Sequence, residues 1–206
     1  MSKDIIVTVG RQYGSGGRRI GRRVADKLGI PFYDRELIAM AAKESGLREE
    51  LLASFDEKAA NSFLYSVVMG MGAASRAGVM GEMPLNDRLF LIQSDVIREI
   101  ASRGPCVLVG RCSDYVLKDC ADTVDVFVHA DLGQRMEFVV REYGVEAGQA
   151  ESIINKTDKK RSSYYNYYTG SKWGMAENYD LCIDSGIGLE NCAEIIATLA
   201  RLRSEE

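Results

Sequence analysis

Short apolar runs alternate with amphipathic helical patterns along this chain. The runs, each ended by a glycine or a polar residue, predict buried strands over 5–9, 32–33, 106–109, 124–128 and 181–183. Between the first two, Ile20, Val24 and Leu28 recur at helical spacing, and Gly29 with Pro31 ends that helix. Strands that alternate with helices predict an α/β fold with a five-stranded parallel sheet.

Further helical patterns follow the later strands. Residues 132–143 predict an amphipathic helix whose apolar side holds Leu132, Met136, Val140 and Tyr143, and residues 189–199 predict a final helix. The stretch 47–103 has a helical pattern with one interruption at about 78–87. We therefore predict one domain over 1–206, with a helical insert at about 35–103 and a charged, tyrosine-rich segment at about 145–175.

A glycine-rich loop joins the first strand to the first helix. A strand, a tight glycine loop and a helix in this order form an anion site, because backbone N–H groups converge there and the helix N-terminus adds partial positive charge. Two cations in the first helical turn, Arg18 and Arg19, oppose the macrodipole of an empty helix and would favour a bound phosphate. The alternative is a plain tight turn with both arginines in solvent. Predicted phosphate contacts are Arg11, Tyr13, Gly14, Ser15, Gly16 and Gly17.

The loop departs from the P-loop signature G-x-x-x-x-G-K-[ST]. Gly17 stands at the lysine position, Arg11 at the first glycine and Arg18 at the Ser/Thr position. In that signature the lysine reaches the β- and γ-phosphates and the hydroxyl helps to hold Mg²⁺. Phosphate binding is therefore better supported than catalysis, and Arg18 or Arg19 are candidates to replace the missing charge.

Composition excludes several classes of function. A net charge of −4 argues against a general nucleic-acid binder, which needs broad positive charge. The sequence has one histidine and five cysteines without a CxxC pair, which argues against a zinc site. No apolar run reaches membrane-spanning length, and the unpaired cysteines fit a cytoplasmic protein with buried thiols.

The loop and its surroundings resemble the cytidylate-kinase-like family. The resemblance is carried by residues 6–18 (IVTVGRQYGSGGR) and 31–36 (PFYDRE), with weaker matches at 109–111, 130–135 and 179–185. It implies a P-loop NTPase-type fold in three layers, with a helical insert and a lid. It also implies transfer of a phosphoryl group from ATP, with Mg²⁺, to a nucleoside monophosphate, with CMP or dCMP as candidates.

Residue by residue, the resemblance assigns a substrate side. Asp34 and Arg35 follow the second strand, where these kinases begin their monophosphate-binding region, and Arg111 and Arg135 match arginines near the substrate. Asp34 as a helix N-cap is the equal alternative. Val109 and Cys112 occupy the positions of two aspartates in the family's Asp-Gly-Arg-Asp segment. The metal ligands therefore stay unknown, with Asp34, Asp114 and Asp131 as substitutes among which the sequence does not choose.

The segment 145–175 is the candidate lid. Arg161 is the predicted transition-state cation, with Lys156 and Lys159 behind it, because cations that close over a triphosphate offset the charge of the transition state. A solvated basic helix face is the alternative. Tyrosines at 164, 165, 167 and 168 favour packing against the core or a second subunit, and packing is also the expectation for Trp173.

Two other functions stay open on the sequence. The missing lysine and aspartates favour a nucleotide-binding sensor or scaffold without catalysis. A kinase for another small hydroxylated metabolite is the third reading, because fold alone does not choose the acceptor. The expected partners are small nucleotides, with neither nucleic acid nor membrane, and a homodimer through the helices of 47–103 is left open.

Overall fold

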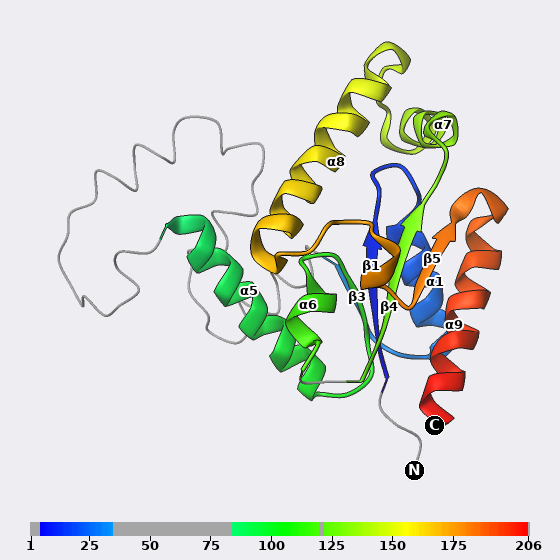
Figure 1. Ribbon diagram of the computed structural model, residues 1–206. Coiled ribbons are helices and arrows are strands. Elements are labelled where there is room, and N and C mark those ends of the chain that lie inside the picture. The colour runs from blue at the N-terminus through cyan, green and yellow to red at the C-terminus, as the bar shows by residue number, and fades with distance from the viewer. Residues whose placement is uncertain (1–4, 35–83, 120–121, 206) are drawn as a thin grey trace. The chain divides into compact units, whose positions relative to one another are not determined.

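Five parallel strands form one sheet at the centre of the computed structural model (Figure 1), which describes residues 5–34, 84–119 and 122–205. The strand order is β2-β3-β1-β4-β5. The strands are β1 (Ile6–Arg11), β2 (Phe32–Tyr33), β3 (Val107–Val109), β4 (Thr123–His129) and β5 (Leu181–Asp184). The predicted fold class and all five predicted strands are thus confirmed.

Strand β1 extends two residues past the end of its apolar run. Gly10 pairs with Phe127 and Arg11 with Val128 of β4, so the strand continues past the glycine that was expected to stop it. These pairings exist because the neighbouring strand β4 is long. The apolar pattern of β1 alone does not show how far its neighbour extends. Arg11 is therefore the last residue of a strand at the carboxyl edge of the sheet, and it does not belong to the loop.

Helices cover both faces of the sheet. On one face α1 (Gly17–Leu28) contacts β1, β3 and α9 (Leu189–Glu205), and on the other face α6 (Ser113–Leu117) contacts β1 and β4. Burial on both sides explains the continuous apolar strands: Ile6 and Val7, which point to opposite faces, are 2% and 0% exposed. The predicted cap of α1 is confirmed, because Gly29 ends it with φ +68°.

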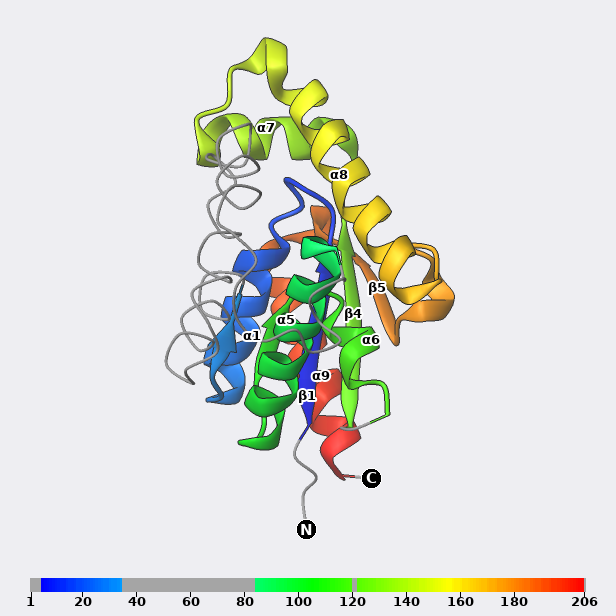
Figure 2. The same cartoon turned by 90° about the vertical axis from the view of Figure 1, so that its left-hand side faces the viewer.

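Two helices lie beyond the carboxyl ends of the strands, α7 (Leu132–Tyr143) and α8 (Ala147–Thr169) (Figures 1 and 2). They pack on each other through Val139, Ala150 and Ile154, and Tyr13 of the glycine loop packs against the same cluster. Because ligands bind in open parallel α/β sheets at this edge, α7 and α8 are positioned to cover a ligand on the loop.

The buried face of α7 differs from the predicted one. Arg135, Phe138 and Val139 are buried, whereas Val140 is 36% and Tyr143 49% exposed. The predicted apolar stripe placed the last two inside. The helix is turned because Gly14 packs directly beneath it: a Cβ on Gly14 would lie 2.8 Å from the carbonyl oxygen of Arg135.

The chain divides into two compact units, residues 1–35 with 98–206 and residues 36–97. The helix α5 (Leu85–Ser102) begins in the second unit and ends in the first. The second unit covers most of the predicted insert, and the prediction of one domain over 1–206 is not tested by this division. Arg35 and most of the insert lie outside the described residues, as do residues 47–83 of the stretch for which a homodimer was left open. The remaining elements are two 3-10 helices, Ala176–Asn178 and Ser185–Ile187.

Cysteines follow the predicted pattern in the described part of the chain. Cys106, Cys112 and Cys192 are buried free thiols, and Cys182 is a partly buried one. Burial raises the pKa of Cys106 and of Cys112 to about 12, so both thiols stay protonated at neutral pH. Among the described helices, none is both long and apolar enough to cross a membrane.

Candidate functional site

The glycine loop runs from Gln12 to Gly16 and ends directly on α1. Gly14 and Gly16 have φ values of +82° and +74°, which side chains rarely adopt, and Gly16 is the N-cap of the helix. A Cβ on Gly16 would lie 2.6 Å from Leu189 Cδ2. The left-handed backbone therefore favours glycine here, and the N-terminus of α1 opens at the loop as an anion site requires.

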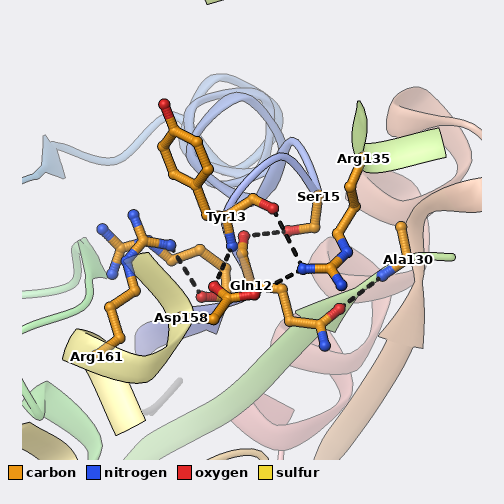
Figure 3. A network of polar contacts seen from close by, with 8 residues as sticks. Gln12, Tyr13, Ser15, Ala130, Arg135, Asp158 and Arg161 are labelled. Atoms are coloured by element: carbon orange, nitrogen blue, oxygen red, sulfur yellow. Dashed lines mark hydrogen bonds and ion pairs between the residues drawn. The ribbon is translucent and has the colours of Figure 1, made fainter. Parts of the chain in front are cut away.

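Internal hydrogen bonds fix the loop (Figure 3). The side-chain oxygen of Gln12 accepts from Ala130 N at 3.1 Å, which joins the loop to the end of β4. Ser15 Oγ donates to Gln12 O at 2.9 Å, and Ser15 is 1% exposed. The Ser15 hydroxyl therefore completes the turn, and it does not stand in for the Ser/Thr hydroxyl of the P-loop signature.

Asp158 of α8 joins three elements. Its carboxylate accepts from Tyr13 N at 2.7 Å and from Arg135 Nη1 at 2.6 Å, so it connects α8 to the loop and to α7 (Figure 3). Arg135, predicted as a substrate contact, is 8% exposed, and within the described chain its Nε has no hydrogen-bond partner. A buried guanidinium with one unsatisfied N–H beside the loop is suited to a further anion.

The inner face of α8 carries Ile154, Asp158, Arg161 and Tyr165. This spacing follows one helical stripe, and Ile154 and Tyr165 at its ends are buried. The sequence pattern predicted Arg161 with Lys156 and Lys159 behind it and did not single out Asp158. An apolar residue at each end of the stripe is the signal that marks Asp158 as an inward carboxylate. Lys156 and Lys159 are exposed.

Arg161 reaches the end of β1. Its Nη1 donates to Arg11 O at 3.2 Å, and its Cζ lies 5.5 Å from the centroid of the Tyr13 ring. Tyr13 in turn contacts the ring of Tyr143 on α7. The predicted lid cation is therefore beside the loop, which is where a transition-state charge on a loop-bound phosphate would develop.

Two more arginines join Arg161. Burial, then the charges of Arg161 and Arg111, lower the pKa of Arg11 below its usual value. Arg111 also hydrogen-bonds Tyr164 of α8. Three cations from a strand end, a strand-following turn and α8 thus meet at the carboxyl edge of the sheet, and like charges brought together in this way favour a bound anion.

The turn after β3 has an unusual backbone. Gly110, Arg111 and Cys112 all have positive φ, at +81°, +61° and +55°. A non-glycine residue in this region costs roughly 1–2 kcal/mol, and such residues cluster at functional sites. The rest of the fold maintains this turn and, with it, the position of Arg111.

The two arginines of the first turn of α1 have other partners. Arg18 Nε forms an ion pair with Asp34 Oδ2 at 2.6 Å, and Asp34 is 4% exposed. Arg19 pairs with Glu142 of α7 and stacks on Phe138. Arg11, rather than Arg18 or Arg19, is thus the loop-proximal arginine that neighbours Arg111 and Arg161. The alternative role of Asp34, as the N-cap of a helix that follows it, involves residues outside the described part of the chain.

The candidate metal ligands do not come together. Asp114 accepts from Tyr165 Oη at 2.7 Å, Asp131 caps α7 by accepting from Gly133 N, and Asp34 is paired with Arg18. No group of three His, Cys, Asp or Glu side chains fit to hold a metal occurs among the described residues. These residues do not fit a resident Mg²⁺ site, so no chemical step is assigned to one.

Aromatic residues of the predicted lid pack only in part against the core. Trp173 contacts the ring of Phe127 edge-on at 5.2 Å between centroids. Tyr165 is buried, and burial with the nearby Asp114 raises its pKa. Tyr167 is 72% exposed and Tyr168 contacts it, so only part of the tyrosine run faces the core.

A parallel sheet in this strand order, with a glycine loop between β1 and α1, defines a P-loop kinase fold. The chain belongs to the cytidylate kinase-like family, whose model matches residues 6–187. The suspected family is confirmed.

Solved structures share the fold. An uncharacterized protein from Eubacterium ventriosum ATCC 27560 is 25% identical with a TM-score of 0.71, covering 95% of this chain and 98% of that one. A gluconokinase from Sinorhizobium meliloti 1021 is 16% identical with a TM-score of 0.57, covering 98% and 97%. A shikimate kinase from Bacteroides thetaiotaomicron is 14% identical with a TM-score of 0.53, covering 98% and 99%. No curated protein matches the sequence.

Proposed function

We propose that this protein is an ATP-dependent phosphotransferase whose acceptor is a nucleoside monophosphate, with CMP and dCMP as the first candidates. The observation that carries the proposal is the meeting of Arg11, Arg111 and Arg161 beside the glycine loop. Membership of the cytidylate kinase-like family supports the acceptor class. The fold shared with gluconokinase and shikimate kinase is compatible with phosphoryl transfer and does not bear on the acceptor.

Each group has a role in this proposal. The loop from Tyr13 to Gly17 binds phosphates of ATP, and Arg161 of α8 neutralises charge that builds up on the transferred group. Arg111 and Asp34, at the ends of β3 and β2, bind the acceptor. Catalysis consists of positioning and charge neutralisation, with water excluded beneath α7 and α8. Further roles for Arg18, Arg19, Lys156, Lys159, Arg35 and Arg135 in binding these phosphates stay predictions.

An acceptor panel tests the proposal. The protein is incubated with ATP and Mg²⁺, and ADP is measured with CMP, dCMP, UMP, AMP or GMP present, or with no acceptor. ADP formation that requires one of these acceptors is the expected result. Absence of acceptor-dependent turnover across the panel would exclude the proposed reaction.

One substitution tests the role of Arg161. Arg161→Ala should lower kcat by roughly 10²-fold or more, because a cation aimed at the transferring group acts mainly in the transition state. Arg201→Ala is the matched control, since Arg201 lies on the exposed side of α9 and bonds only to Lys27 O and Glu194 among the described residues. Equal activity in the two variants would remove Arg161 from the mechanism.

A nucleotide-binding protein without transfer is the second candidate. It is favoured by the Asp158 carboxylate, which already accepts from the loop N–H of Tyr13, and by the described carboxylates that do not assemble around a metal. This candidate predicts saturable ATP binding without ADP formation. A measured transfer activity that disappears in Arg161→Ala would eliminate it.

A further inference from the structure

Position 17 has no room for a side chain. A Cβ on Gly17 would lie 2.6 Å from Arg11 Cβ and 3.0 Å from Arg11 Cγ. Gly17 begins α1, and its φ lies outside the positive region, so the backbone does not require glycine there. Glycine at the lysine position of the loop is therefore dictated by the stem of Arg11.

The guanidinium end of the Arg11 side chain lies against a second glycine, Gly110. A Cβ on Gly110 would lie 2.0 Å from Arg11 Nη1 and 3.0 Å from Arg11 Cζ. Gly110 follows β3, the strand beside β1, and its N–H donates to Val9 O at 3.1 Å. The Arg11 side chain thus starts at the end of β1, passes the first residue of α1 and ends over the turn after β3.

The charged groups around Arg11 support the same conclusion as the steric contacts. No carboxylate of the described chain forms an ion pair with Arg11. Asp34, a carboxylate that raises the pKa of Arg11, is itself bound to Arg18, while Arg161 and Arg111 are the neighbouring cations that lower this pKa. The Arg11 guanidinium is partly buried and lies beside two other guanidinium groups and the N-terminus of α1. This position is suited to binding an anion from outside the chain.

From these observations we infer that Arg11 replaces the missing P-loop lysine and binds the β-phosphate of the nucleotide from the last position of β1. This inference rests on the proposed nucleotide site. A guanidinium donates two parallel hydrogen bonds to phosphate oxygens, whereas an ammonium acts as a point charge. The arrangement differs from the standard P-loop in origin and geometry: the cation comes from the strand before the loop, and Gly17 and Gly110 make space for it.

An exchange of the two positions tests the inference. Binding of ADP and of AMP is measured by calorimetry for the unmodified protein, Arg11→Gly, Gly17→Lys and the double variant Arg11→Gly/Gly17→Lys. Arg11→Gly should weaken ADP binding by roughly 30-fold and AMP binding by much less, because the lost contact is to the β-phosphate. Gly17→Lys alone should also weaken ADP binding, because the new side chain displaces Arg11. The double variant should recover ADP affinity to within about fivefold of the unmodified protein.

Gly110→Ala provides an independent measurement in which Arg11 is retained. The added Cβ should displace the guanidinium and weaken ADP binding by roughly 10-fold. Gly29→Ala is the control, because Gly29 also has positive φ, at +68°, but a Cβ there meets nothing within 4 Å. Both variants should lose similar stability from backbone strain, and only Gly110→Ala should lose ADP affinity.

The outcomes separate the inference from the proposed function. Unchanged ADP affinity in folded Arg11→Gly, or a folded double variant no better than Arg11→Gly, would overturn the role of Arg11. Should the double variant fail to fold, equal ADP affinity in Gly110→Ala and Gly29→Ala would overturn it as well. Intact ADP binding without acceptor-dependent turnover would overturn only the proposed function. Failure of the unmodified protein to bind ADP would overturn both.

Discussion

Thr8 and Asp125 show how one partly buried carboxylate is held within the sheet. They are paired on β1 and β4, and Thr8 Oγ1 donates to Asp125 Oδ1 at 2.6 Å. Burial raises the pKa of Asp125 to about 6, and the neighbouring Asp114 and Asp180 add to that rise, while the bonds from Thr8 and Thr123 oppose it. The pKa of Asp125 is therefore well above the value that the same carboxyl has in the unfolded chain.

Stability should consequently fall as pH rises from about 4 to 6, because the folded state holds the Asp125 proton that the unfolded state has released. Asp125→Asn should flatten this fall and make the protein more stable at pH 7 by roughly 1–2 kcal/mol. Urea unfolding at pH 4, 5, 6 and 7 measures it. Asp26→Asn on the exposed side of α1 is the control, and identical pH dependence in both variants would contradict the expectation.

Residue types alone predicted part of the site. The order of strand, glycines and helix was enough to predict the glycine loop between β1 and α1, and the basic, tyrosine-rich pattern singled out Arg161, which lies beside that loop. Phosphate binding by these residues stays a prediction. Arg11 was predicted as a phosphate contact, but the path of its side chain was not predictable, because it runs between Gly17 and Gly110, which are distant in sequence and adjacent only through the pairing of β1 with β3. Arg18 and Arg19 were favoured instead on helix position alone.

At the scale of elements, one carboxylate of α8 bonds both to the glycine loop and to α7. Asp158 accepts from the loop and from buried Arg135, while Ile154 packs on α7. Removing one partner of a largely buried ion pair leaves an uncompensated charge. The attachment of α8 is therefore expected to depend more on Asp158 than on the exposed lysines of the same helix.

Asp158→Asn should lower the free energy of unfolding by roughly 2–3 kcal/mol and speed amide hydrogen exchange in α8. Glu151→Gln removes the same charge from an exposed position of that helix and should change neither quantity by more than about 0.5 kcal/mol. Denaturant melts and exchange measured by mass spectrometry provide the readouts. Equal stability of the two variants would show that the Asp158 contacts contribute little.

The elements themselves were largely predictable from periodicity. Strands buried on both faces are continuous apolar runs, α1 ends at its predicted glycine cap, and α7 ends at the predicted residue 143. The exceptions have tertiary causes: β1 is extended by its pairing with β4, and α7 is rotated by the close approach of Gly14.

At the scale of the whole molecule, the site depends on three segments that lie far apart in the sequence. Arg11 ends β1, Arg111 follows β3 and Arg161 lies on α8. A phosphate chain bound among them would connect the sheet to α8, so that unfolding either would release the ligand. Ligand binding should therefore stabilise the fold as a whole.

ADP at about 100 times its Kd should stabilise the protein by roughly 2.7 kcal/mol, which is about 5–10 °C in Tm for a chain of this size. Adenosine, which lacks phosphate, should give a much smaller shift at equal concentration. Increasing salt should reduce the ADP effect, because charge attraction is screened. Scanning calorimetry provides the measurement, and an adenosine shift as large as that of ADP would show that the base, rather than the phosphates, dominates binding.

The steric exclusion between a side chain at position 17 and Arg11 also limits how such a loop can change during evolution. A lysine gained at position 17 would collide with the arginine, and an arginine lost from position 11 would leave the loop without either cation. Single substitutions therefore pass through an intermediate with two cations in one space or with none. The two loop designs are separated by a barrier that a lineage crosses only by paired changes, so each is expected to persist once established.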